Sequence, residues 1–289
     1  MTAPGAVRDE VELFGGPAAM FGCRHLPGAS GGEAATAGVL VCSSVGPGAA
    51  ASYGAEARLG RALARAGVTV QRFHYRGTGA SDGAAHAIGF AGLVDDAREA
   101  LDLLRAQRPA RVAFVGVRLG ALVACRLAAA LDDAPVALWS PVLDPRRFLT
   151  QAVAARPASR GSVDDAPTTS ASAPDVDVFA MPLAGELLDG AAVAGLGDEL
   201  GARPRDVLVL RTDDRDEADG YDALVRRWQA RGLRVDVTTV PTDGERDGLP
   251  VPVAPSGALV ARTTAWLADH LLGLAGRAAH QRAGQEADR

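Results

Sequence analysis

Short apolar segments alternate with segments of helical periodicity along most of this chain. The expected strands lie at 38–44, 68–77, 111–117, 136–144, 206–212 and 233–240. Between 90 and 104 the apolar residues recur at helical spacing, which places them on one helix face. Strands that are apolar throughout are covered on both faces, so the alternation predicts a mostly parallel sheet between two layers of helices.

Further elements are expected around this repeat. Residues 11–26 are predicted to form a β-hairpin that turns at Gly15-Gly16-Pro17. Additional helices are expected at 55–67, 119–131, 219–231 and 255–277. The last of these helices is also a candidate surface for a homodimer.

One interruption divides the repeat. Residues 1–144 and 206–277 are expected to form the core, and 145–205 a cap insertion. The middle of the insertion, 155–174, is rich in Ala, Pro, Ser and Thr and is predicted to be flexible. Its flanks, FLTQAV and FAMPLAGELLDGAAVAGL, are predicted to be short cap helices, and 278–289 a disordered tail.

Composition limits the classes of partner. The 289 residues are 48% hydrophobic, enough for one large core, and carry 30 basic and 35 acidic side chains. A formal charge of -5 gives no electrostatic attraction to nucleic acid or to an anionic membrane. The three cysteines have no spacing typical of a metal site, and no secretory signal is evident, so we expect a cytoplasmic protein with reduced thiols and with neither metal nor cofactor.

The segment Gly116-Val117-Arg118-Leu119-Gly120 joins an expected strand to an expected helix. It matches the G-x-S-x-G nucleophile elbow except that arginine replaces serine. The stretch FHYRGTGASDG resembles the DYRGxGxSxG segment of serine-aminopeptidase-like proteins, with His74 where aspartate is usual. The chain therefore resembles α/β-hydrolases of that branch, and most of all the hydrolase-like proteins of exosortase and exopolysaccharide systems; this implies an α/β-hydrolase fold.

The resemblance implies positions for a catalytic triad that this sequence does not fill. Arg118 has no lone pair with which to attack a carbonyl. The acid position falls near Asp213, Asp214 or Asp216. The histidine is expected within 241–250, where none occurs. Hydrolysis by a serine mechanism is therefore not expected.

An arginine at a helix N-terminus requires a nearby negative charge. One interpretation is a former hydrolase whose site is closed by an internal ion pair. The acids that could form the pair are Asp213, Asp214, Asp216, Asp243, Glu245 and Asp247. A second interpretation is a pocket in which Arg118 and the Leu119 amide bind an anionic or carbonyl-bearing small molecule, either without catalysis or for a lyase or cyclase reaction.

A third interpretation keeps acyl hydrolysis through a relocated residue. Cys42 is a candidate nucleophile if Arg118 favours its thiolate, although its position in an apolar run favours a buried, inert thiol. His74 ends a strand at the edge where parallel sheets bind ligands. The remaining candidate pocket residues are Ser43, Ser44, Trp139 and Ser140, while Ser81 is expected to shape its loop.

Overall fold

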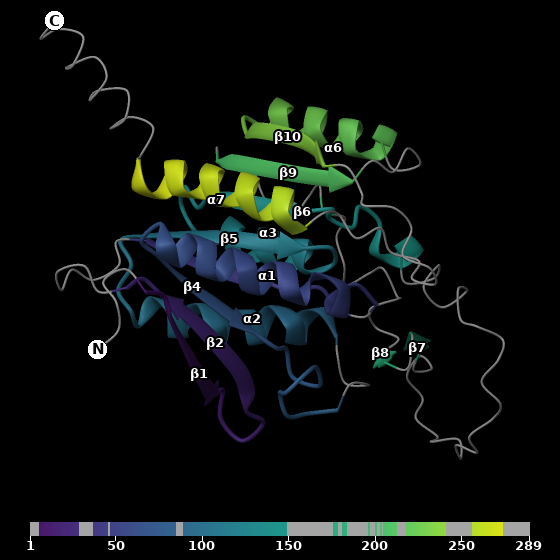
Figure 1. The fold of residues 1–289 in the computed structure, drawn as a ribbon. Coiled ribbons are helices and arrows are strands. Elements are labelled where there is room, and N and C mark those ends of the chain that lie inside the picture. Colours follow the sequence, from purple (N-terminus) through teal and green to yellow (C-terminus); the bar gives the residue numbers. More distant parts are fainter. Residues whose placement is uncertain are drawn as a thin grey trace, which may run out of the picture.

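The computed structural model describes residues 6–28, 37–45, 47–84, 89–148, 176–178, 181–183, 205–212, 218–240 and 256–273, together with positions 196, 200 and 203. Within these residues, an eight-stranded sheet lies between two layers of helices (Figure 1). Its strands are β1 (Arg8–Phe14), β2 (Met20–Leu26), β3 (Ala37–Cys42), β4 (Val68–Phe73), β5 (Arg111–Val117), β6 (Val136–Trp139), β9 (Asp206–Thr212) and β10 (Arg234–Val240).

The strand order is β1-β2-β4-β3-β5-β6-β9-β10. Strand β2 pairs antiparallel with both β1 and β4, and the remaining neighbours pair in parallel. The hairpin turns through Gly15 and Gly16, whose φ angles of 93° and 76° favour residues without a Cβ. The predictions of a mostly parallel sheet and of an N-terminal hairpin are confirmed.

Helices cover both faces of the sheet. On one face lie α1 (Pro47–Arg65) and α7 (Ser256–Leu272), which form the front layer in Figure 1. On the other lie α2 (Phe90–Arg105), α3 (Gly120–Ala129) and α6 (Ala218–Ala230). None of these helices combines the length and apolarity required to cross a bilayer.

The two helical layers explain why β3 is apolar along its whole length and β5 from Val112 onward. In β3, Leu40 packs toward α2 and α3, whereas Val41 packs toward α1 and α7. Phe114 and Val115 alternate in the same way along β5. Successive side chains of a strand point to opposite faces, so a strand buried on both faces needs apolar side chains in both registers.

The insertion departs from the prediction where it is described. Strands β7 (Val176–Val178) and β8 (Met181–Leu183) form a separate two-stranded antiparallel sheet. The helix expected across FAMPLAGELLDGAAVAGL is wrong at β8, because Pro182 lacks the amide hydrogen that a helix interior requires. Segments 155–174 and 278–289, for which flexibility was predicted, lie outside the described residues.

Candidate active site at the strand-to-helix corner

Arg118 occupies the corner between β5 and α3. Its φ of 50° is a left-handed conformation that non-glycine residues rarely adopt. A Cβ on Gly116 would lie 2.5 Å from Cα of Ala121. A Cβ on Gly120 would overlap the carbonyl oxygens of Cys42 and Ser43. The two glycines thus allow the helix to begin directly against the sheet, and the arginine stands at the apex of the turn.

A second residue beside Arg118 has a similar backbone conformation. Ser140 follows β6 with a φ of 40°. The backbone N–H of Arg118 donates to the carbonyl of Trp139 at 3.0 Å, and that of Val142 donates to the carbonyl of Arg118 at 3.3 Å. Left-handed non-glycine residues concentrate at functional sites. Two neighbouring strand ends therefore meet in a strained corner at the carboxyl edge of the sheet.

The Arg118 side chain has few polar contacts. Its Nη1 donates weakly to the carbonyl of Ser140 at 3.4 Å, and its guanidinium carbon lies 5.2 Å from the centre of the Phe148 ring. Its Nε is buried without a hydrogen-bond partner. Within the described part of the chain, no carboxylate forms an ion pair with Arg118. The acids expected to neutralise it all fall at 213–217 or 241–250, outside the described residues.

Backbone amides add to the positive charge of this corner. The Leu119 N–H precedes α3, and among the described residues no backbone carbonyl accepts a hydrogen bond from it. Helix N-termini carry about half a positive charge and favour anions. The Leu119 amide and the Arg118 guanidinium together can receive a carboxylate, a phosphate or a polarised carbonyl oxygen.

The serines that follow β3 bond to neighbouring groups. Ser43 Oγ donates to Glu56 Oε2 at 2.6 Å, and Ser52 Oγ donates to Glu56 Oε1 at 2.7 Å. Glu56 is buried on α1. Ser44 Oγ donates to the Val45 carbonyl at 3.1 Å. The hydroxyls of Ser43 and Ser44 therefore hold the loop beside the corner, and none of the described histidines contacts either of them.

Cys42 points into the core on the α2 side of the sheet. Its thiol is fully buried. Burial raises the pKa of the Cys42 thiol far above its ordinary value, although the hydroxyl of Tyr75 opposes this effect. The thiolate required for attack is thus disfavoured, and the geometry gives no support to Cys42 as a relocated nucleophile.

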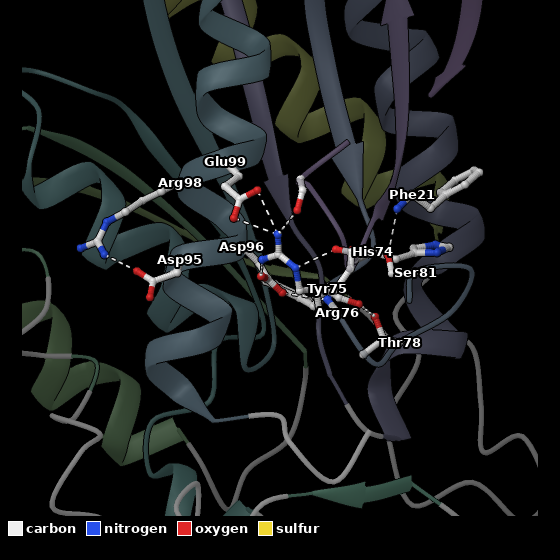
Figure 2. Close-up of polar contacts among 12 residues, drawn as sticks. Phe21, His74, Tyr75, Arg76, Thr78, Ser81, Asp95, Asp96, Arg98 and Glu99 are labelled. Carbon is white, nitrogen blue, oxygen red and sulfur yellow. Dashed lines mark hydrogen bonds and ion pairs between the residues drawn. The ribbon is translucent and has the colours of Figure 1, made fainter. Parts of the chain in front are cut away.

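His74 is held by the loop that follows β4. Its Nδ1 accepts a hydrogen bond from the Ala80 N–H at 3.0 Å, and its ring stacks on Phe21 with 4.9 Å between centroids. Burial and the nearby Arg72 lower the pKa of His74. Ser81 Oγ donates to the His74 carbonyl at 2.7 Å and accepts from the Phe21 N–H at 2.9 Å (Figure 2). Ser81 thus shapes the loop, as predicted.

Arg76 anchors the same loop to α2. Figure 2 shows its guanidinium between Asp96 and Glu99, both of which it contacts. Its Nε and Nη2 donate to the carbonyls of Ala18 at 2.9 Å and of Gly15 at 2.7 Å. The RGTG segment therefore ties the loop, the hairpin turn and a helix together. Its arginine has a structural role, and its acidic partners are too distant in the sequence to be identified from a local pattern.

The candidate Trp139 and the histidine His270 both direct their side chains away from the corner. Trp139 is buried in the core on the α7 side, where its Nε1 donates to Thr263 Oγ1 at 2.8 Å. His270 Nδ1 donates a hydrogen bond to the Trp266 carbonyl at 2.8 Å. Its Nε2 lies 3.9 Å from Asp206 Oδ2, at the amino end of β9 and hence at the sheet edge opposite Arg118. Of the described histidines, none contacts Arg118.

Comparison with known proteins agrees with this architecture. The structure matches that of Est1E from Butyrivibrio proteoclasticus with ferulic acid bound, with a TM-score of 0.65 over 89% of this chain and 97% of that one. The sequence identity is 14%. This protein has the α/β-hydrolase fold. An esterase of Pyrococcus furiosus also matches, with a TM-score of 0.61 and 12% identity, over 92% of this chain and 91% of that chain.

Sequence comparisons cover a smaller part of this α/β-hydrolase-fold chain. Residues 37–176 match the model of the family described as "Serine aminopeptidase, S33". Two uncharacterized proteins from strains of Mycobacterium tuberculosis are each 38% identical over 120 residues, which is 40% of this chain and 40% of theirs. The range of the family match includes the corner at Arg118.

In the α/β-hydrolase fold, the nucleophile stands at the turn that Arg118 occupies here. The candidate acids Asp214 and Asp216 and the segment 241–250 lie outside the described residues. The described part of the site therefore consists of Arg118, the Leu119 amide, the loop that carries Ser43 and Ser44, and the strained backbone at Ser140. This set favours binding of negative charge over nucleophilic attack.

Proposed function

We propose that this chain is a serine-aminopeptidase-related protein that does not hydrolyse by a serine mechanism and instead binds an anionic or carbonyl-bearing small molecule at the corner. The observation that carries the proposal is the Arg118 side chain. It stands in the nucleophile position with a buried, unpartnered Nε and with no carboxylate partner among the described residues.

A guanidinium in this position favours binding for a physical reason. It lies at the N-terminus of α3, where a positive charge is unfavourable by roughly 0.3–1 kcal/mol unless an anion is near. A bound carboxylate or phosphate would satisfy both the guanidinium and the Leu119 amide, because the planar donors of arginine match two oxygen atoms. Catalysis without a covalent intermediate, such as decarboxylation or cyclisation, would be compatible with this site.

Ligand screening by thermal unfolding tests the proposal. We expect one class among carboxylates, acyl-CoA analogues and sugar phosphates to stabilise the full chain; sugar phosphates are included because of the resemblance to exopolysaccharide-system proteins. A ligand about a hundredfold above its Kd stabilises by about 2.7 kcal/mol. Arg118→Asn should abolish this stabilisation while retaining the turn, because asparagine tolerates the left-handed conformation.

Arg98→Gln is the matched control, since Arg98 is an exposed arginine of α2 that pairs only with Asp95 among the described residues. This variant should keep the full ligand effect. The proposal fails if no class stabilises the protein, or if Arg118→Asn binds as well as the unaltered chain. Failure of every ligand would favour the alternative of a site closed by an internal ion pair.

Restoring serine should not restore esterase activity. Arg118→Ser provides a hydroxyl at the corner, but segment 241–250 contains no histidine to accept its proton. We therefore expect no gain in p-nitrophenyl acetate turnover over the unaltered protein, measured by absorbance. A gain that is lost when a second residue is replaced would reveal a base that the sequence does not suggest.

A further inference from the structure

The register of the hairpin places four polar side chains on one face of the sheet, under α1. Asp9 of β1 lies opposite His25 of β2, and Cys23 of β2 lies opposite Arg72 of β4. Cys23 and His25 are two residues apart on one strand, so their side chains share a face. None of these residues belongs to the corner at Arg118.

The contacts form a continuous chain from thiol to carboxylate. Cys23 Sγ lies 3.9 Å from His25 Nε2, and His25 Nδ1 lies 2.6 Å from Asp9 Oδ1. Arg61 of α1 donates to Asp9 Oδ2 at 2.9 Å. The imidazole is fully buried and fits against Gly60, where a Cβ would lie 2.6 Å from its Nε2. The ring is therefore held in one orientation, with one nitrogen toward the acid and the other toward the thiol.

The protonation states of His25 and Asp9 suit transfer of a proton from Cys23 to His25. Burial lowers the pKa of His25 although Asp9 opposes the shift, so the imidazole is neutral at neutral pH. Burial acts to raise the pKa of Asp9, but the hydrogen bonds from His25 and Arg61 lower it overall. An ionised Asp9 selects the tautomer with hydrogen on Nδ1, which leaves the lone pair of Nε2 facing Cys23.

Cys23 differs from the other two cysteines in being partly exposed, whereas Cys42 and Cys125 are buried. It lines a depression together with Phe21, Tyr53, Arg72, Phe73 and His74. Arg72 is 5% exposed and its Nε has no hydrogen-bond partner, although its guanidinium carbon lies 4.6 Å from the Tyr53 ring centre. The thiol thus lies in the same shallow surface depression as a buried cation that has an unused donor.

We propose that Cys23, with His25 as its base and Asp9 as the residue that positions the imidazole, is a nucleophilic thiol that accepts an acyl group from a small activated ester or thioester. This inference does not depend on the ligand proposed for Arg118. Oxyanion stabilisation by the unused Arg72 donor and attack by Cys23 would occur in the same depression.

The reaction balances within the named groups. Cys23 Sγ forms a bond to the acyl carbon while its proton moves to His25 Nε2. The bond between that carbon and the leaving oxygen or sulfur breaks, and the leaving group takes the proton from His25. The product is a Cys23 thioester and an alcohol or thiol. Water that attacks the thioester with His25 as base would release the carboxylic acid and restore the thiol.

Acylation of the full chain by p-nitrophenyl acetate tests the proposal. After an acid quench, intact mass and peptide mapping should place one acetyl group on Cys23. His25→Gln should slow Cys23 acetylation by about 10²-fold or more, the usual effect of losing a general base. Cys125→Ser is the matched control and should leave the rate unchanged. Acetylation confined to other residues, or an unaltered rate in folded His25→Gln, would overturn the proposal.

The pH profile distinguishes base catalysis from a merely accessible thiol. The charged groups that face Cys23 and His25 are Asp9 from β1, Arg72 from β4 and Arg61 from α1, with His74 in the same depression. Burial raises the pKa of Cys23, so a thiol acting alone would react about tenfold faster per pH unit from about pH 7 to 9. With His25 as base, the rate should already be level there, because the imidazole is neutral.

Asp9→Asn provides a second variant in case His25→Gln does not fold, as judged by circular dichroism. Asp9 raises the pKa of His25. Its replacement should therefore lower the plateau rate of Cys23 acetylation and shift the fall of the rate at acid pH to a lower pH. A tenfold rise per pH unit in the unaltered protein, or an unchanged profile in Asp9→Asn, would contradict the proposed roles of His25 and Asp9.

Discussion

Replacing Gly120 with alanine is expected to destabilise the protein by about 3 kcal/mol, as severe overpacking does. The added Cβ would overlap the carbonyl oxygens of Cys42 and Ser43 and lie 2.8 Å from the Cys42 carbonyl carbon. These are backbone atoms of β3 and its loop, which cannot rotate away as a side chain can. Urea unfolding followed by circular dichroism should therefore show a lower midpoint with little change in slope.

Gly54→Ala is the control for this substitution. Gly54 lies within α1, and its nearest atoms to an added Cβ are the Arg58 guanidinium nitrogens at 3.9 Å. Because alanine is the better helix former, this variant should be about 0.5–1 kcal/mol more stable than the unaltered protein. Equal midpoints for the Gly120 and Gly54 variants would show that the corner is not as tightly packed as described.

Replacing Arg76 with methionine is expected to cost about 3 kcal/mol at neutral pH, the scale for breaking a buried ion pair. The Asp96 side chain is 6% exposed and that of Arg76 is 27% exposed. The variant leaves the Asp96 carboxylate with the Arg76 backbone N–H, at 2.8 Å, but without its guanidinium. It also removes the donors to the Ala18 and Gly15 carbonyls.

The destabilisation caused by Arg76→Met should be smaller at acid pH than at neutral pH. Burial raises the pKa of Asp96, and the Arg76 guanidinium opposes the shift, so the pKa rises further in Arg76→Met. A group whose folded-state pKa is raised stabilises the fold below its unfolded pKa, about 3.9, and loses that contribution as pH rises through the folded pKa. The difference in the free energy of unfolding between Arg76→Met and the unaltered protein, measured by urea unfolding, should therefore be smaller at about pH 4 than at neutral pH.

Arg98→Met is the matched control. Figure 2 shows Arg98 on α2, the helix that also carries Asp96. The Arg98–Asp95 pair is exposed, with side-chain fractions of 59% and 65%. Exposed pairs contribute at most about 1 kcal/mol, and i,i+3 or i,i+4 helix pairs less. A comparable loss in Arg98→Met, or a cost in Arg76→Met that does not vary with pH, would contradict the assigned role of Asp96.

The fold was largely predictable because each of its elements has a local signature. Continuous apolar runs indicated β3, β5 and β9, and helical spacing indicated α2. The predicted strand 136–144 was too long: β6 ends at Trp139, where Ser140 turns into a left-handed conformation. Pro141, which follows Ser140, is a sequence signal that the strand ends there, but it does not by itself predict the left-handed conformation of Ser140.

The corner and the thiol site differ in how far they could be predicted. Gly116 and Gly120, four residues apart between an apolar strand and an apolar helix, mark the tight turn in the sequence itself, because both positions require close approach of the backbone. The trio of Cys23, His25 and Asp9 was missed. The spacing of Cys23 and His25 places both side chains on one face of a strand, and the turn at Gly15-Gly16-Pro17 places a second strand beside it. Only the register of the hairpin shows that Asp9 lies opposite His25.

From the order of residues alone follow the alternation of strands and helices, the tight corner with an arginine at its apex, and the lack of a histidine at 241–250. Tertiary structure decided that Arg118 has no carboxylate partner in the described residues, that Glu56 holds the serine loop, and that Asp9 meets His25. The physical reason is range: periodicity and turn geometry act over a few residues, whereas a side chain's partners depend on which strands pair and in which register.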